Sequence, residues 1–361
     1  MAKGIRVGVG GVKTSKKVWV GVGGVARKVK KIFAGIGGVV KLVFSGGEVV
    51  YVGEATQLVQ QRQGMAGASN TTYAMFAGGM SINAAYYRSV DAYDSQLVAN
   101  SSAILWQSVS GLQGAGVGQY AIFAGGSGSG DPLQHASAFN GSLIRTDFYL
   151  SEKKRSFASA WNENYALFAN GLRSNYSSNE SSVVDAFDSA LVRVSAPNRG
   201  GGKTNPAGTR MGEYALVVGG RNYSSSGSTD STLVSAYSSA LVLTTAPSLT
   251  TGTGGSSLNC VGTGSVAMVQ KYGNVNASAY STSLVKTAVV LPSSSPQFAV
   301  GVPGHMIFGS SSKSYVYDEN LVLIKTIDTD FVLNNYIGNI TEASIGDYGL
   351  VSCFRYGNTI Y

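Results

Sequence analysis

The sequence has 361 residues, of which 44% are apolar, 13% are charged and 48 are glycine, a composition typical of an all-β protein with many tight turns. We expect no membrane span, because the sequence holds no run of about 18 or more apolar residues. Two cysteines, Cys260 and Cys353, are too few for a disulfide framework, and the first residues lack the apolar core of a signal peptide.

The positive charge is concentrated near the N-terminus. The whole chain has a net charge of +8, yet residues 1–45 alone contain ten lysines and arginines and no acidic residue. The remainder is therefore slightly acidic. A difference of this size predicts two parts with separate roles, which we place at residues 1–45 and 46–361.

The first part is a short glycine-rich repeat. An alternating apolar stretch with a Gly-Gly pair occurs three times, at 5–12, 18–25 and 32–39. Gly-Gly between alternating strands is a hairpin signal, because both central residues of a type I′ turn need positive φ. We expect a small β-meander with too little core to be stable alone, which gains its stability by docking to a partner or to copies of itself.

The basic side chains of this part have three possible interpretations: attachment to a partner, a solvated face, or nucleic-acid binding. We favour attachment and expect no nucleic-acid partner, since stacking aromatics are scarce and no recognised nucleic-acid-binding fold surrounds the charges. The residues expected to make the attachment are Lys16, Lys17, Trp19, Arg27, Lys28, Lys30 and Lys31.

One apolar phrase recurs through the second part. A nearly continuous apolar run closed by glycine predicts a strand that is buried on both faces. Copies spaced 39 to 52 residues apart predict a repeat architecture. The phrase reads YAMFAGG at 73–79, YAIFAGG at 120–126, YALFANG at 165–171 and YALVVGG at 214–220, and weaker copies begin at Val266, His305 and Tyr348.

Three further strands accompany each apolar phrase. A second phrase, such as VDAYDS at 90–95 or VDAFDS at 184–189, predicts a strand that ends in a turn. A Leu-Val or Leu-Ile pair after it is expected to open another strand. A weak strand of small residues precedes each apolar phrase, as at 113–117 and 157–160. Four strands per unit predict the blades of a β-propeller.

The two ends of this part are expected to share one blade. Residues 49–60 resemble the late half of a unit, while the last unit, which begins near residue 336, lacks its final strand. We therefore expect residues 49–60 to complete that unit, which gives seven blades closed as a ring. Closure removes the free sheet edges that invite aggregation.

The connections that follow the apolar phrases are the candidate binding loops. They are rich in Tyr, Asn, Arg, Ser and Gly, which adaptable binding loops use, and equivalent loops of a propeller emerge on one face. The alternative is that they are ordinary soluble turns. The candidate ligand-binding residues are Tyr86, Tyr87, Arg88, Arg173, Asn175, Tyr176, Arg221, Asn222 and Tyr223.

No pattern in the sequence indicates catalysis, so we expect no enzyme, no cofactor and no metal. The recurring acids Asp91, Asp94, Asp185, Asp188 and Asp318 sit at strand–turn positions, where turn capping explains them. The two histidines lie in different units, whereas a metal site needs more ligands. A pair of glycosidase carboxylates could still converge on the propeller axis.

Both parts of the chain resemble known proteins. The phrases of the form YALFAGG followed by VDAYDSxLV resemble Kelch-type repeats over residues 49–361, although the Tyr and Trp that usually follow the double glycine are absent in that form. The segment VGVGGVARKVKK at 20–31 is similar to N-terminal repeats of phage and prophage proteins from Gram-positive bacteria, which are often joined to Kelch-like propellers.

This double resemblance implies a non-enzymatic virion structural protein, made in the bacterial host cytoplasm, such as a phage tail fibre or receptor-binding component. Residues 1–45 would bind other virion proteins, in a homo-oligomer, and the propeller would contact host-surface glycan. Two alternatives are a capsid or neck decoration (a head fibre protein) and a carbohydrate-active propeller enzyme.

Overall fold

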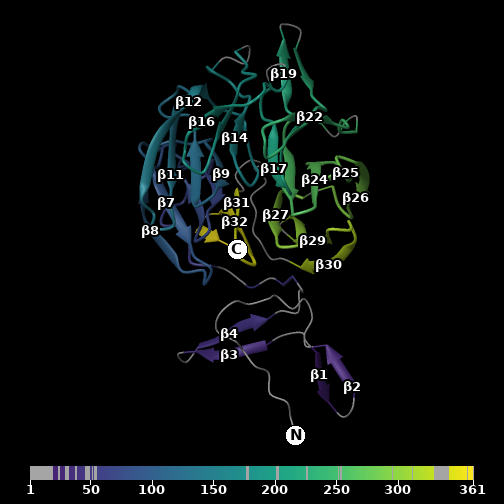
Figure 1. Cartoon of the computed structure of the whole chain (residues 1–361). Helices are drawn as coiled ribbons and strands as arrows, with labels where there is room; N and C mark the ends of the chain where they lie inside the picture. The colour runs from purple at the N-terminus through teal and green to yellow at the C-terminus, as the bar shows by residue number, and fades with distance from the viewer. Residues whose placement is uncertain are drawn as a thin grey trace. The chain divides into compact units, whose positions relative to one another are not determined.

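A computed structural model (Figure 1) describes residues 19–22, 25–28, 32–36, 39–44, 49–50, 52, 55–175, 179–200, 203–224, 227–250, 252, 254–294, 296–310, 312–328, 341–355 and 357–360. The chain divides into two compact units, Met1–Tyr51 and Val52–Tyr361. Every regular element in the described part is a β-strand. None of the described residues forms a helix of the length and apolarity that a membrane crossing requires.

The first unit contains two antiparallel hairpins. Strand β1 (Trp19–Val22) pairs with β2 (Val25–Lys28), and β3 (Ile32–Ile36) pairs with β4 (Val39–Phe44). The second and third Gly-Gly pairs fall between two strands that pair up to their last residues, as the hairpin prediction requires. In the described residues the hairpins form two separate two-stranded sheets, where one meander was expected. The first copy of the repeat, at 5–12, lies outside the described residues.

The second unit contains seven larger sheets, numbered here in chain order over the described residues. Sheets 1 to 6 have four antiparallel strands each, and sheet 7 has three. Sheet 1 contains β5 (Ala66–Ser69), β6 (Ala74–Ala77), β7 (Ser89–Tyr93) and β8 (Ala99–Ile104); sheet 2 contains β9 (Gln113–Val117), β10 (Tyr120–Ala124), β11 (Leu133–Phe139) and β12 (Arg145–Lys154). Sheet 3 contains β13 (Ala158–Trp161), β14 (Ala166–Ala169), β15 (Val184–Phe187) and β16 (Arg193–Ser195); sheet 4 contains β17 (Ala207–Met211), β18 (Tyr214–Val218), β21 (Val234–Tyr237) and β22 (Leu243–Ala246).

The remaining strands complete the later sheets. Sheet 5 contains β23 (Leu258–Gly262), β24 (Val266–Lys271), β25 (Asn276–Ser281) and β26 (Lys286–Val290); sheet 6 contains β27 (Phe298–Val302), β28 (His305–Gly309), β29 (Lys313–Asp318) and β30 (Leu323–Asp328). Sheet 7 contains β31 (Thr341–Ile345), β32 (Tyr348–Arg355) and β33 (Gly357–Ile360). A small hairpin of β19 (Arg221–Ser224) and β20 (Gly227–Asp230) is inserted in sheet 4.

Sheets 1 to 6 are arranged around an axis as the blades of a β-propeller, and the three-stranded sheet 7 lies between sheets 6 and 1 (Figure 1). The first strand of each sheet contacts the first strand of the next, and β31 of sheet 7 contacts both β27 and β5. Apolar clusters fill the space between neighbouring sheets; one of them joins Met75 and Ala92 of sheet 1 to Phe123 and Phe139 of sheet 2. The core is therefore a set of layers between sheets.

The apolar phrases form the second strands, as predicted. All residues of β6 and β14 are buried, as are the last four of β10 and β18. The double glycine that ends the phrase is left-handed, with φ of 66° at Gly78 and 101° at Gly79. In sheet 3 Asn170 replaces the first glycine of the pair and has a φ of 64°. Asn tolerates this left-handed conformation better than most residues do.

The first strands carry small residues at the positions where they pack backbone against backbone. A Cβ added at Gly262 would lie 1.7 Å from the carbonyl oxygen of Arg210, and one at Gly208 would lie 2.1 Å from that of Ser159. At Gly67 the Cβ would lie 1.9 Å from the carbonyl oxygen of Glu342. Such separations are far below van der Waals contact, so these positions require glycine.

The leucine of each Leu-Val or Leu-Ile pair does not open a strand, which corrects the sequence prediction. It closes the turn instead: the Leu97 N–H donates to the Asp94 carbonyl oxygen at 2.9 Å. A left-handed leucine costs about 1 kcal/mol, and packing of its side chain into the cluster between sheets offsets that cost. The six leucines with φ between 57° and 62° are Leu97, Leu143, Leu191, Leu241, Leu284 and Leu321.

The recurring acids serve two purposes, and turn capping explains only some of them. The Asp94 Oδ1 atom accepts hydrogen bonds from the backbone N–H groups of Gln96 and Val98, at 2.8 and 2.9 Å. Asp188 and Asp318 accept equivalent bonds in sheets 3 and 6. The turn-capping interpretation is confirmed for these three residues.

Asp91 and Asp185 are instead buried partners of buried cations. The Arg62 Nη2 atom lies 2.5 Å from Asp91 Oδ2, and the Lys154 Nζ atom lies 2.8 Å from Asp185 Oδ2. Each cation also donates to the carbonyl oxygen at the fourth place of the apolar phrase, Phe76 or Phe168. Turn capping was therefore the wrong interpretation for these two acids.

A buried cation beside sheet 4, in the linker before β17, has no buried aspartate as its partner. Arg199 is fully buried and donates to the Ser235 hydroxyl and to the carbonyl oxygens of Gly219 and Leu233. Ser235 occupies the ladder position that Asp91 and Asp185 occupy in their sheets. Burial lowers the pKa of Arg199 to about 10. The guanidinium thus loses hydration without gaining a carboxylate.

Residues 55–60 lie between sheet 7 and sheet 1 but form no strand. Leu58 packs in a cluster with Ile345 and Leu350 of sheet 7 and with Tyr93 of sheet 1. Residues 51, 53 and 54 are outside the described part, so the strand expected over 49–60 is not observed there. The contact expected between this segment and the last sheet is present.

We predict that Ser235→Asp stabilises the protein by about 1 kcal/mol at neutral pH, because the new carboxylate would pair with Arg199 as Asp185 pairs with Lys154. Ser278→Asp is the matched control. Ser278 occupies the same position in sheet 5 and is buried, and its hydroxyl forms no hydrogen bond with a lysine or arginine of the described residues, so this variant should lose stability. Thermal unfolding of both variants checks the prediction, and equal losses in the two would contradict it.

Candidate functional site

The loops between second and third strands are connected to one another from sheet 2 to sheet 5. The Asn175 side chain donates to the Gly130 carbonyl oxygen at 2.5 Å, and the Tyr223 N–H donates to Glu180 Oε1 at 2.8 Å. Lys271 of sheet 5 forms an ion pair of 2.8 Å with Asp230 of the β19–β20 hairpin. The loops therefore form one continuous surface, called here the loop face.

The candidate residues of sheets 3 and 4 come together on this face. Arg173 is exposed, donates to the Glu180 carbonyl oxygen at 3.0 Å and lies 3.8 Å from Glu152. Asn175 is exposed as well. Because Glu180 also binds the Tyr223 N–H, it joins the two loops directly. Tyr176 lies outside the described residues.

The β19–β20 hairpin presents the candidates of sheet 4 (Figure 1). Arg221 pairs with Asp230 across the hairpin at 3.1 Å, and the Asn222 amide oxygen accepts a short hydrogen bond from the buried Lys203 ammonium. Arg221 and Asn222 thus hold the hairpin in place. The half-buried Tyr223 side chain forms a hydrogen bond with the neighbouring Arg221.

The candidates of sheet 1 form a separate group. Tyr86 and Tyr87 are half-buried and Arg88 is exposed, in the loop between β6 and β7. Sheet 2 stands between this loop and those of sheets 3 and 4, and no hydrogen bond or ion pair among the described residues connects the two groups. The structure brings together the candidates of sheets 3 and 4 only.

The proposed attachment residues lie in the first unit. Trp19 is in β1, and Arg27 and Lys28 are in β2. Lys16, Lys17, Lys30 and Lys31 lie outside the described residues. The attachment role of this group stays a prediction.

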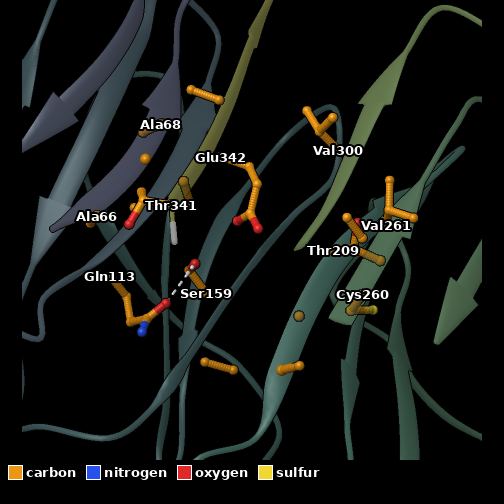
Figure 2. Close-up of a pocket in the computed structure, with 18 of the residues that line it drawn as sticks. Ala66, Ala68, Gln113, Ser159, Thr209, Cys260, Val261, Val300, Thr341 and Glu342 are labelled. Atoms are coloured by element: carbon orange, nitrogen blue, oxygen red, sulfur yellow. Dashed lines mark hydrogen bonds between the residues drawn. The ribbon is translucent and has the colours of Figure 1, made fainter. Parts of the chain in front are cut away.

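A second candidate site is a cavity of about 500 Å³ on the propeller axis. The first strands of all seven described sheets line it, and their small side chains leave the space open. Its polar groups include Gln113, Ser159 and Thr209, and the Ser159 hydroxyl donates to Gln113 Oε1 at 3.4 Å (Figure 2).

Glu342 is the acidic side chain of this cavity. Figure 2 shows its carboxyl group pointing into the open space. Loss of hydration inside the protein raises the pKa of Glu342 to about 8, although a backbone hydrogen bond from Ala299 acts in the opposite direction. Cys260 lines the same cavity, and burial raises the pKa of its thiol to about 12. Both groups are therefore mainly protonated at pH 7.

Sequence reasoning missed Glu342, yet a signal was present. The ladder places one first-strand residue opposite the fourth residue of each apolar phrase. These seven residues are Gly67, Gly114, Ser159, Gly208, Cys260, Ala299 and Glu342. Alignment of the weak strands by this position would have shown one large charged residue among small ones.

A surface cluster on sheet 2 was missed as well. Trp106 is 56% exposed and stacks on His135, with ring centroids 5.5 Å apart. Asp147 holds His135 at 3.2 Å and Arg145 at 2.9 Å, and Tyr149 packs edge-on against His135. These residues come from the linker before β9 and from β11 and β12, so the sequence separates them.

Two comparisons of sequence gave no match: no protein-family model and no curated protein matches the chain. Solved structures do match. A structure described as a streptogramin B lyase has a TM-score of 0.56 at 9% identity, covering 86% of this chain and 96% of that one. A structure of YjhT has a TM-score of 0.55 at 7% identity, covering 85% and 99%. At such low identity these similarities establish the β-propeller fold alone.

We predict that Glu342 makes stability fall with rising pH. The pKa of the Glu342 carboxyl is raised in the folded state, so folding favours the protonated form. The free energy of unfolding should therefore decrease by up to about 1.4 kcal/mol per pH unit as the pH rises from about 4.5 to about 8. Glu342→Gln should remove this decrease. Unfolding by denaturant at several pH values measures this change in the free energy of unfolding. Glu163→Gln, at an exposed site, is the control and should retain the wild-type dependence on pH. A wild-type profile in Glu342→Gln would contradict the assignment.

Proposed function

We propose that the chain is a non-enzymatic virion structural protein, a phage tail fibre or receptor-binding component whose propeller contacts host-surface glycan. The observation that carries the proposal is the loop face, where exposed Arg173 and Asn175 lie beside Tyr223 on loops that bind one another. Rigid aromatic rings beside amide and guanidinium groups provide stacking and hydrogen bonds for a sugar. Each contact is small, so many copies on a particle would supply avidity.

We further propose a seven-bladed, Kelch-like propeller. Supporting this, the Tyr237 and Tyr280 hydroxyls donate to the carbonyl oxygens of Pro197 and Pro247, each just after the fourth strand of the preceding sheet. The Tyr93 hydroxyl donates in the same way to Thr56 at 2.7 Å. Thr56 thus corresponds to the residue after a fourth strand. The residues just before it would supply the fourth strand of sheet 7.

A carbohydrate-active enzyme is the second candidate. Among the described residues that line the axial cavity, Glu342 is the one acidic side chain, whereas glycoside hydrolysis commonly uses two carboxyl groups. The binding proposal therefore has more support.

A capsid or neck decoration is the third candidate, and it predicts no binding to host cells.

We expect the full-length protein to bind host cell-wall glycan and the double variant Arg173→Ala/Tyr223→Ala to bind about ten-fold more weakly, because both a charged donor and a ring are lost. Biolayer interferometry on immobilised wall polysaccharide measures this.

The control for this experiment is Gln96→Ala/Glu319→Ala. Both residues are exposed in turns between third and fourth strands, which lie at the opposite ends of the strands from the loop face, so binding should be unchanged. Absence of wild-type binding would favour the decoration role. Release of reducing sugar by the wild type would favour the enzyme.

Deletion of residues 1–45 should leave a soluble propeller that no longer enters particles, because we propose that this part binds the other virion proteins. Circular dichroism checks folding, and immunoblotting of purified particles checks incorporation. Normal incorporation of the truncated chain would contradict the attachment role.

A further inference from the structure

Packing around the axis does not require an acid at position 342. The six equivalent positions hold Gly, Ala, Ser or Cys, and neighbouring first strands approach so closely there that glycine is needed at several of them. Glu342 alone among these seven positions extends a long side chain into the cavity. A carboxyl group at this place accepts a backbone hydrogen bond from Ala299 yet still reduces stability at neutral pH, so we look for its value in what it can bind.

The surroundings of Glu342 select the charge of a ligand. No lysine, arginine or histidine is among the described residues that line the cavity, and no described cation forms an ion pair with Glu342. The other titratable groups of the lining are the Cys260 thiol and the Tyr272 phenol. An anion would find no counter-charge here. A cation would find the Glu342 carboxylate as its counter-charge, and the lining also includes the aromatic residues Trp161 and Tyr272.

The size and donor set of the cavity select an organic cation over a metal ion. The described residues contain no group of three or more His, Cys, Asp or Glu side chains that could hold a metal. The volume of about 500 Å³ is that of a small-molecule site. A primary ammonium group carries three N–H donors, and the cavity offers the Glu342 carboxylate and the hydroxyls of Ser159 and Thr209 as acceptors.

We propose that the axial cavity binds a small primary alkylammonium ion, with the carboxylate of Glu342 as its counter-ion. This site is separate from the loop face, and the inference does not depend on the proposed function. Binding replaces one proton by one cation: the Glu342 carboxyl releases its proton to solvent, and the ammonium group keeps all three of its own.

Proton release makes the affinity depend on pH. The empty cavity holds a protonated carboxyl below about pH 8, so the cation must displace that proton. Affinity should therefore rise about ten-fold for each pH unit below about 8 and level off above it, as long as the amine stays protonated.

The test is isothermal titration calorimetry of the full-length protein with n-butylammonium chloride at about pH 6.5 and about pH 8.5. The wild type should bind at least ten-fold more tightly at the higher pH. At about pH 6.5, where the carboxyl of the empty cavity is protonated, binding should release up to one proton, measured by repeating that titration in buffers of different ionisation enthalpy. Glu342→Gln should bind at least ten-fold more weakly than wild type at the higher pH, while Glu163→Gln should match the wild type.

Neutral and anionic probes complete the experiment. n-Butanol and butyrate should bind much more weakly than n-butylammonium to the wild type. Equal binding of n-butanol, unchanged binding by Glu342→Gln, or binding of n-butylammonium without proton release would each overturn the proposal. The proton-release measurement uses the wild type alone, so the test does not depend on the folding of a variant.

Discussion

The propeller depends on backbone-to-backbone packing between the first strands of neighbouring sheets. At Gly67, Gly208 and Gly262 a carbonyl oxygen from the first strand of the neighbouring sheet occupies the place where a Cβ would stand. The apolar strands behind them can then bury both faces in the layers between sheets. The same packing determines the axis: because the first strands carry small side chains, their centre stays open as a cavity. The fold and the cavity thus have one physical origin.

Much of the propeller could be predicted from the sequence because its strongest signals are local. The apolar phrase has enough consecutive buried residues to identify a strand, and its glycines or Asn170 identify the left-handed end. Where two local explanations compete, the sequence is insufficient. Asp91 and Asp94 stand three residues apart in one phrase, yet one faces a buried guanidinium and the other caps a turn. Only the path of the linker that brings Arg62 beneath β7 distinguishes them.

The candidate site was predictable to a smaller extent. Equivalent loops were expected on one face, and those of sheets 2 to 5 do contact one another. The sequence did not show that Arg221 and Asn222 are engaged in holding the hairpin. The loop residues that remain free for a ligand are determined by partners distant in sequence. Glu342 lies in a weak strand without an apolar pattern, so its place on the axis depends on strand pairing.

The junction between sheets 7 and 1 has a consequence for biosynthesis. The Thr341 hydroxyl donates to the Met65 carbonyl oxygen and the Ser344 N–H donates to the Ser69 hydroxyl, across separations of 276 and 275 residues. A ribosome needs on the order of tens of seconds to make that much chain. Throughout that interval the edge of β5 that does not pair with β6 stays open to other strands, a hazard for a nascent chain. The small side chains of β5, Ala-Gly-Ala-Ser, offer little apolar surface to such encounters, which protects the chain until its last strands are made.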